Sequence, residues 1–255
     1  MRAEDFIRDH PLCCYCGGFT PAATIDHQPA KIAFAKKHRP KGLEFPACLR
    51  CNGQTAVDEC LLAIVARLTG SLRPGIKPDN GLDRALQTVS SAYPDLLPSM
   101  QAATVDVAGR PMPAIDLNKK EVNEGLCRIA AKMGLATYYG ETGQIAKPGT
   151  RVNTLWTHNQ RKDGREEVER LLGKFSKSKQ LKQGRWDTGD TFFIRYLVED
   201  TRDGVAVMAA AVFHESVALL AQMIDGCDAP PWESLAYTFA PDQADGIKLI
   251  SQRWA

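Results

Sequence analysis

Two Cys-x-x-Cys pairs constrain the fold of this chain more than any other feature of its sequence. Cys13 and Cys16 form the first pair in the tract CCYCGG, and Cys48 and Cys51 form the second in CLRCN, with 31 residues between the pairs. A zinc ion takes four soft ligands in a tetrahedron, and a Cys-x-x-Cys turn supplies two of them. We therefore predict one structural zinc site formed by these four cysteines.

The chain has eight cysteines, so disulfide bonds are the alternative to a metal site. The N-terminus, MRAEDFIRDH, is polar and acidic from its third residue, and we infer neither a secretory signal nor a transit peptide. We expect a soluble cytoplasmic protein with reduced thiols, in which cysteine pairs are more often metal ligands. No apolar run approaches the ~20 residues that a membrane helix needs, so we expect no membrane partner.

The remaining cysteines have a different expected role. Cys14 lies inside the first pair and is expected to point away from the metal, although it could replace a neighbouring ligand. Cys60, Cys127 and Cys227 are isolated among apolar residues, which is typical of small buried hydrophobic side chains.

Length and composition indicate a globular protein. With 255 residues, 44% hydrophobic and 24% charged, the chain is neither disordered nor fibrous, and it can form one large or two small domains. Helical periodicity predicts helices over 52–68, 82–93 and 118–133, the last ending at Gly134. Alternating or apolar runs predict strands over 152–156, 191–198 and 205–213, whereas 216–224 fits a strand or a helix.

These segments predict an α+β protein. We expect a zinc-bearing domain over 1–70, a helical linker over 71–100 and a C-terminal α+β domain with an antiparallel sheet over 101–255. The C-terminal domain could bind a protein partner or a second copy of the chain.

The small net charge of +2 conceals a segregation of charge. Residues 147–185 contain eleven basic and four acidic residues, whereas residues 187–255 contain four basic and eleven acidic ones. This asymmetry permits nucleic-acid binding, but the two segments could equally face each other. In the first segment, Lys174, Lys177 and Lys182 are candidate phosphate contacts.

Between the cysteine pairs lies Asp26-His27, and Asn52 directly follows the last cysteine. An imidazole with its ordinary pKa of ~6.5 can serve as a general base near neutrality. A carboxylate and an amide carbonyl are oxygen ligands suited to Mg²⁺ or Mn²⁺. The two cysteine pairs would fix the strand bearing Asp26-His27 against the start of the helix bearing Asn52.

The order of these motifs, in CCYCGG, TIDHQPAK and FPACLRCN, resembles the zinc-bearing HNH endonucleases of the ββα-metal class. The resemblance covers residues 13 to about 60. It implies a ββα-metal module with treble-clef-like zinc and metal-dependent hydrolysis of phosphodiester bonds, with DNA favoured over RNA. It also implies that His27 is the general base, that Asp26 and Asn52 hold one magnesium or manganese ion, and that zinc is purely structural.

The chain departs from that pattern at two places. Leu43 and Glu44 stand where the family usually has an Asn, and Thr55 stands where it usually has a Lys that contacts phosphate. The missing contact could come from a basic residue of the intervening segment or of the second cysteine pair: Lys31, Lys36, Lys37, Arg39, Lys41 or Arg50. Asp58-Glu59 resembles a pairing frequent in the family, but ordinary helix surface charge explains it equally well.

A second class of function is compatible with the same residues. A non-catalytic zinc-knuckle module could use the cysteines only to present a basic surface to nucleic acid. The features that favour a nuclease are Asp26, His27 and Asn52, because a binding module has no need of a base beside two oxygen ligands.

Overall fold

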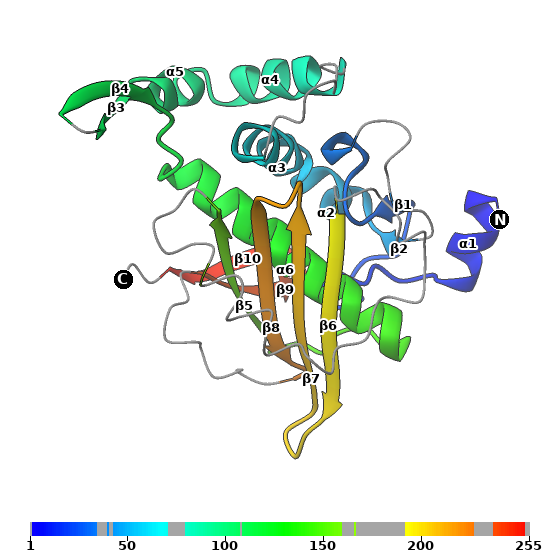
Figure 1. The fold of residues 1–255 in the computed structure, drawn as a ribbon. Coiled ribbons are helices and arrows are strands. Elements are labelled where there is room, and N and C mark those ends of the chain that lie inside the picture. The colour runs from blue at the N-terminus through cyan, green and yellow to red at the C-terminus, as the bar shows by residue number, and fades with distance from the viewer. Residues whose placement is uncertain are drawn as a thin grey trace.

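The computed structural model describes residues 2–34, 40, 43–70, 80–107, 109–159, 166, 192–226 and 237–252. Over these ranges helices and antiparallel strands are both well represented, as expected for an α+β protein (Figure 1). None of the helices in the described ranges is long and apolar enough to cross a membrane.

The N-terminal region, residues 2–70, is a small unit of short elements. In chain order these are α1 (Ala3–Asp9), β1 (Thr24–His27), the 3-10 helix η1 (Lys31–Ala33), β2 (Glu44–Ala47), α2 (Leu49–Gln54) and α3 (Ala56–Thr69). β1 and β2 pair antiparallel, with Asp26 opposite Phe45 and His27 opposite Glu44. The helix expected over 52–68 is two helices, because the backbone leaves the helical path at Thr55. We call this region the cysteine unit.

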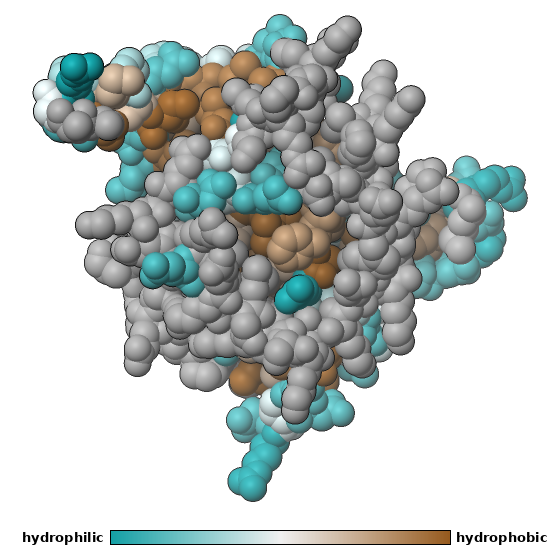
Figure 2. Space-filling view, in the orientation of Figure 1, coloured by the Kyte–Doolittle hydropathy of each residue, from teal (hydrophilic) through white to brown (hydrophobic). Residues whose placement is uncertain are grey.

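Residues 80–114 form an extension along one side of the molecule, at the top of Figure 1. It consists of α4 (Asn80–Ala92), α5 (Leu96–Gln101) and the hairpin of β3 (Ala103–Val107) and β4 (Arg110–Ala114). Figure 2 shows hydrophobic surface over α4 and α5, where Leu82, Leu86 and Leu97 are only partly buried.

The remaining elements form a long helix against a six-stranded antiparallel sheet. The helix is α6 (Lys120–Thr142), and the sheet has the order β10-β9-β5-β8-β7-β6. Its strands are β5 (Arg151–His158), β6 (Phe192–Asp200), β7 (Val205–Phe213), β8 (Val217–Ile224), β9 (Tyr237–Asp242) and β10 (Gly246–Gln252). The segment 216–224, which the sequence left open, is a strand, whereas β9 and β10 had no counterpart in the sequence prediction.

The prediction that a helix ends at Gly134 is wrong. α6 continues for two more turns and ends at Gly143, whose φ of 69° is the left-handed conformation typical of a helix C-terminus. Gly134 serves packing instead: a Cβ on it would lie 2.9 Å from the Cβ of Ala221 in β8. The glycine therefore lets α6 lie close to the sheet.

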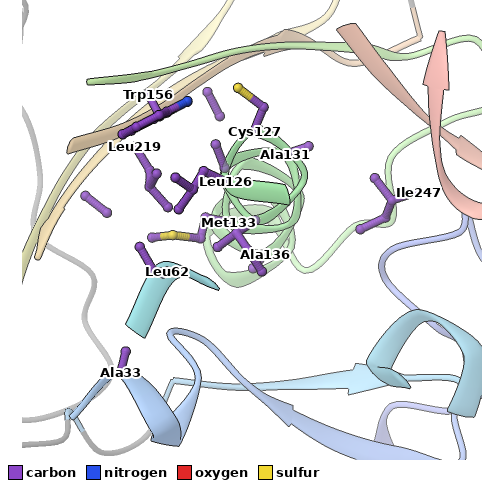
Figure 3. Packing of buried hydrophobic residues seen from close by; sticks show 14 of the residues in the cluster. Ala33, Leu62, Leu126, Cys127, Ala131, Met133, Ala136, Trp156, Leu219 and Ile247 are labelled. Atoms are coloured by element: carbon purple, nitrogen blue, oxygen red, sulfur yellow. The ribbon is translucent and has the colours of Figure 1, made fainter. Parts of the chain in front are cut away.

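Most buried apolar side chains of the cysteine unit, α6 and the sheet form one continuous core, and a smaller cluster in the sheet contains Leu155 and Leu220. Leu62 of α3 and Ala33 of η1 belong to the same cluster as Leu126 and Met133 of α6 and Leu219 of β8 (Figure 3). Helix α6 thus lies between α3 and the sheet and contributes buried side chains to both sides.

Candidate metal and catalytic site

The sulfur atoms of Cys13, Cys16, Cys48 and Cys51 all lie within 4.8 Å of one another, and all four residues are buried. In a tetrahedral zinc site with Zn–S distances of ~2.3 Å, the sulfurs are roughly 3.8 Å apart. The cluster therefore needs only a small contraction to hold zinc, and its four soft donors suit that ion. The geometry supports the zinc site expected from the sequence.

The local backbone explains how each pair converges. Gly17 and Gly18 have φ values of 72° and 75°, so the chain turns back after Cys16 in a conformation that other residues rarely adopt. Cys48 precedes α2, and its sulfur accepts a hydrogen bond from the backbone N–H of Cys51 at 3.4 Å. Cys14 is buried outside the cluster, and burial raises the pKa of its thiol.

His27 ends β1 at the surface of the cysteine unit. Its side chain is 24% exposed, and its Nδ1 lies 3.6 Å from the Oε1 of Glu44, the residue opposite it on β2. At 3.6 Å this is an ion-pair contact for a protonated ring, longer than the hydrogen bond with which a carboxylate orients an imidazole.

Asp26 faces the opposite way, as neighbouring residues of a strand do, and is 3% exposed. Its Oδ2 accepts hydrogen bonds from the hydroxyl of Tyr15 at 2.6 Å and from Nε2 of Gln28 at 2.8 Å. Its Oδ1 accepts one from Nζ of Lys132 at 3.1 Å. Both carboxylate oxygens are thus engaged inside the protein.

Lys132 lies in α6 and its side chain is fully buried. Besides Asp26, its Nζ donates to Oγ1 of Thr55 at 2.8 Å and to Oε1 of Glu59 at 3.3 Å. Burial by itself lowers the pKa of this ammonium, but the charges of Asp26 and Glu59 more than offset that effect, and the pKa is raised. Lys132 is therefore a buried, charged group.

Sequence reasoning missed Lys132. The available signal was its place within the run IAAKMGLA, where a lysine interrupts an otherwise small and apolar stretch of a helix. A charged side chain in such a stretch requires a buried partner, and the partner here comes from β1, 106 positions earlier in the chain.

Asn52 lies in α2, and its Nδ2 donates a hydrogen bond to Oγ1 of Thr24 at 3.2 Å. This bond joins α2 to the beginning of β1. The structure thus assembles His27, Asp26 and Asn52 within one unit, with His27 and Asn52 partly exposed and Asp26 turned into the core.

The pair Asp58-Glu59 is not surface charge. Asp58 is buried and accepts a hydrogen bond from Arg128 of α6 at 2.7 Å, while Glu59 contacts Lys132. Two basic residues one turn apart on α6 therefore meet two adjacent acidic residues of α3.

The basic residues expected to contact nucleic acid are only partly described. Lys31 in η1 and Arg50 in α2 are exposed, and Nη1 of Arg50 donates to the backbone carbonyl of Ala244. A surface hollow of about 350 Å³ beside Arg50 is also lined by Arg128 and Lys248. Seven further residues lie outside the described ranges: Lys36, Lys37, Arg39, Lys41, Lys174, Lys177 and Lys182.

Comparison of the chain with protein-family models, with curated proteins and with solved structures found no match.

Proposed function

We propose that the chain is an HNH-type endonuclease that hydrolyses phosphodiester bonds of nucleic acid, with DNA the favoured substrate. The observation that carries this proposal is the β1-β2-α2 order closed by the four-cysteine cluster. With that closure, His27 at the end of β1 and Asn52 in α2 belong to one compact unit, linked through the hydrogen bond from Asn52 to Thr24.

In the proposed reaction His27 is the general base. Because Nδ1 is the ring nitrogen near Glu44, we assign Nε2 as the nitrogen that takes the proton from the attacking water. Zinc in the cysteine cluster would supply no chemistry at the reaction centre, because all four of its coordination positions are filled by sulfur. Exposed Lys31 and Arg50 are the described cations that could attract the phosphate backbone.

A magnesium or manganese ion enters this proposal only through the resemblance of the sequence. The arrangement of Asp26 does not fit such an ion, because both of its oxygens already accept hydrogen bonds. Its Oδ1 accepts from the ammonium of Lys132, whose positive charge lies where a metal ion would have to approach. We therefore derive no step through a divalent ion, and the dependence of cleavage on Mg²⁺ or Mn²⁺ stays a prediction.

The ion pair between Lys132 and Asp26 favours a second candidate, a zinc-stabilised module that binds nucleic acid without cutting it. A carboxylate neutralised by a buried lysine contributes to structure, and a binding module needs nothing more from Asp26.

Nicking of supercoiled plasmid by the zinc-loaded protein tests the nuclease proposal. We compare wild type, His27→Ala and the control Arg8→Ala, whose arginine lies in α1 with its side chain 71% exposed. Each is assayed in buffer alone and with added Mg²⁺ or Mn²⁺, and its zinc content is measured. The expected result is cleavage by wild type and the control and a loss of about 10²–10⁴ in rate for His27→Ala, with zinc content and DNA affinity unchanged.

Two outcomes contradict the nuclease proposal. If His27→Ala cuts at the wild-type rate, the proposed base is wrong. If wild type binds DNA or RNA without cutting either in any of these buffers, the binding module replaces the nuclease.

A further inference from the structure

Three oxygen atoms from three different places in the cysteine unit surround the Lys132 ammonium. They are Oδ1 of Asp26 at 3.1 Å, Oγ1 of Thr55 at 2.8 Å and Oε1 of Glu59 at 3.3 Å. Two carboxylates and a hydroxyl are hard oxygen donors of the kind that Mg²⁺ and Mn²⁺ bind in proteins. The ammonium thus sits where a metal ion would sit in a cage of this composition.

The charges around this point favour a cation of higher charge than one. Asp26 and Glu59 face a single ammonium, while the neighbouring Arg128 is directed to Asp58. The other oxygen of Asp26 receives only neutral donors, from Tyr15 and Gln28. One lysine therefore compensates two carboxylates, and without it the buried Asp26 and the 18% exposed Glu59 would both lack a counter-charge.

The cage also joins two parts of the fold. Asp26 lies in β1, Thr55 at the break between α2 and α3, and Glu59 in the first turn of α3. Lys132 reaches this point from the middle of α6, where its side chain also approaches the ring of Tyr15, with Nζ 5.3 Å from the ring centroid. The Lys132 ammonium thus comes from α6, the helix that packs on the sheet.

From these contacts we propose that Asp26, Thr55 and Glu59 form a latent divalent-cation site, which the Lys132 ammonium fills and thereby closes to metal ions. In the native protein the site is an internal ion-pair lock between the cysteine unit and α6. Removal of the lysine side-chain charge opens it to Mn²⁺ or Mg²⁺. This inference does not rest on the proposed nuclease activity.

The test counts Mn²⁺ ions bound to the zinc-loaded protein, with free Mn²⁺ measured by its paramagnetic resonance signal. The variants are Lys132→Met and the double variant with Lys132→Met and Glu59→Gln. Arg128→Met is the matched control, because it also removes a cation of α6 that faces an acidic residue of α3.

We expect Arg128→Met to bind Mn²⁺ with the same stoichiometry and affinity as wild type. Lys132→Met should bind one Mn²⁺ about tenfold or more tighter than wild type, and the double variant should lose that gain. A folded Lys132→Met protein without a Mn²⁺ site overturns the proposal, and so does a gain of the same size in Arg128→Met.

Asp26→Asn keeps the proposal falsifiable if Lys132→Met does not fold, because an amide preserves the shape of the side chain. If wild type binds one Mn²⁺ and Asp26→Asn abolishes this binding, the ion reaches Asp26 despite the lysine and the proposal is wrong. If Asp26→Asn leaves Mn²⁺ binding at the wild-type level, exclusion by Lys132 is supported. Mn²⁺ counts require no cleavage, so failure of the nuclease proposal is read separately.

Discussion

The cysteine unit and the sheet with α6 reach stable structures by different means. β1 and β2 have four residues each and α2 has six, so these elements depend on the cysteine cluster and on directed polar contacts, although α3, with 14 residues, packs apolar side chains into the core shared with α6. The strands of the sheet have six to nine residues, α6 has 23, and most of their buried side chains are apolar. Short elements need ligands that fix position, whereas long ones can be positioned by buried area alone.

Helix α6 is held both by buried apolar contacts and by directed polar contacts. On the side of the sheet it packs through small residues, with Gly134 against Ala221. On the side of the cysteine unit it contributes Lys132 and Arg128 to buried ion pairs, and a Cβ on Gly125 would lie 2.8 Å from Oδ1 of Asp58. The helix thus meets a mainly apolar surface on the side of the sheet, whereas on the side of the cysteine unit buried ion pairs accompany its apolar contacts.

The largest effect should come from breaking the cysteine cluster. Cys48→Ser should abolish zinc binding, because it removes one of the four soft ligands. It should also destabilise the fold, because structural zinc contributes directly to folding. We expect the thermal midpoint to fall by about 10 °C or more. Zinc content by atomic absorption and thermal melting by circular dichroism measure both effects.

Cys60→Ser is the matched control, since Cys60 is buried but lies outside the cluster. It should keep stoichiometric zinc. If Cys48→Ser melted like wild type, the cysteine unit would be held by packing alone, and the contrast between the two regions would disappear.

The next largest effect should come from the ion pairs that join the regions. In metal-free buffer, Lys132→Met leaves the buried Asp26 and the partly exposed Glu59 without a counter-charge, and the free energy of unfolding should fall by about 3–5 kcal/mol. Arg128→Met should cost less, because it leaves one carboxylate, that of Asp58, without a counter-charge, whereas Lys132→Met leaves two. Urea denaturation of the zinc-loaded proteins gives both values, and equal losses would count against a special role for Lys132.

A pair of glycine substitutions compares the packing of the two regions. Gly134→Ala places a methyl group 2.9 Å from Ala221, and this overpacking should exceed the gain in helix propensity, with a net loss of about 1 kcal/mol. A Cβ on Gly53 in α2 would meet no atom within 4 Å, so Gly53→Ala should stabilise by about 0.5–1 kcal/mol. Urea midpoints that shift in the same direction for both variants would contradict this difference.

The sequence predicted the features that depend on local spacing. The four cysteines converge as their spacing indicated, and the strands over 191–198 and 205–213 correspond to β6 and β7. Its failures involve long-range partners. From the sequence, Gly134 resembles a helix end, whereas in the structure it allows close packing against Ala221. The partner of Lys132 is Asp26, a strand residue far away in the sequence. For Asp58 the sequence left surface charge and a family-like pairing equally open, since nothing local indicates its partner Arg128.

In the candidate site, too, the sequence predicted the local arrangement but not the long-range contacts. Adjacency in sequence places Asp26 and His27 together, but strand geometry sends their side chains to opposite faces of β1. Sequence reasoning grouped them because their residue types suit one reaction. Whether both serve it depends on Lys132, which no local pattern connects to Asp26.

The smallest predicted effect lies just before α6, outside both cores. Oδ2 of Asp116 is 2.9 Å from Nζ of Lys119, and its Oδ1 accepts a hydrogen bond from the backbone N–H of Asn118 at 2.9 Å. These two contacts lower the pKa of the Asp116 carboxyl below its usual value. Because the folded-state pKa is the lower one, the contribution to stability is present above the unfolded-state pKa and is lost as pH falls through the folded-state pKa.

Asp116→Asn should therefore lower the free energy of unfolding at pH 7 by less than about 1 kcal/mol, since solvent screens an exposed pair. The difference from wild type should shrink as the pH is lowered below about 4, where the carboxyl of the unfolded chain becomes protonated. Urea denaturation at a series of pH values measures it. A loss at pH 7 as large as that of Lys132→Met would mean that an exposed ion pair next to α6 stabilises the protein as much as the buried ion pairs of α6. The distinction between exposed and buried ion pairs would then fail.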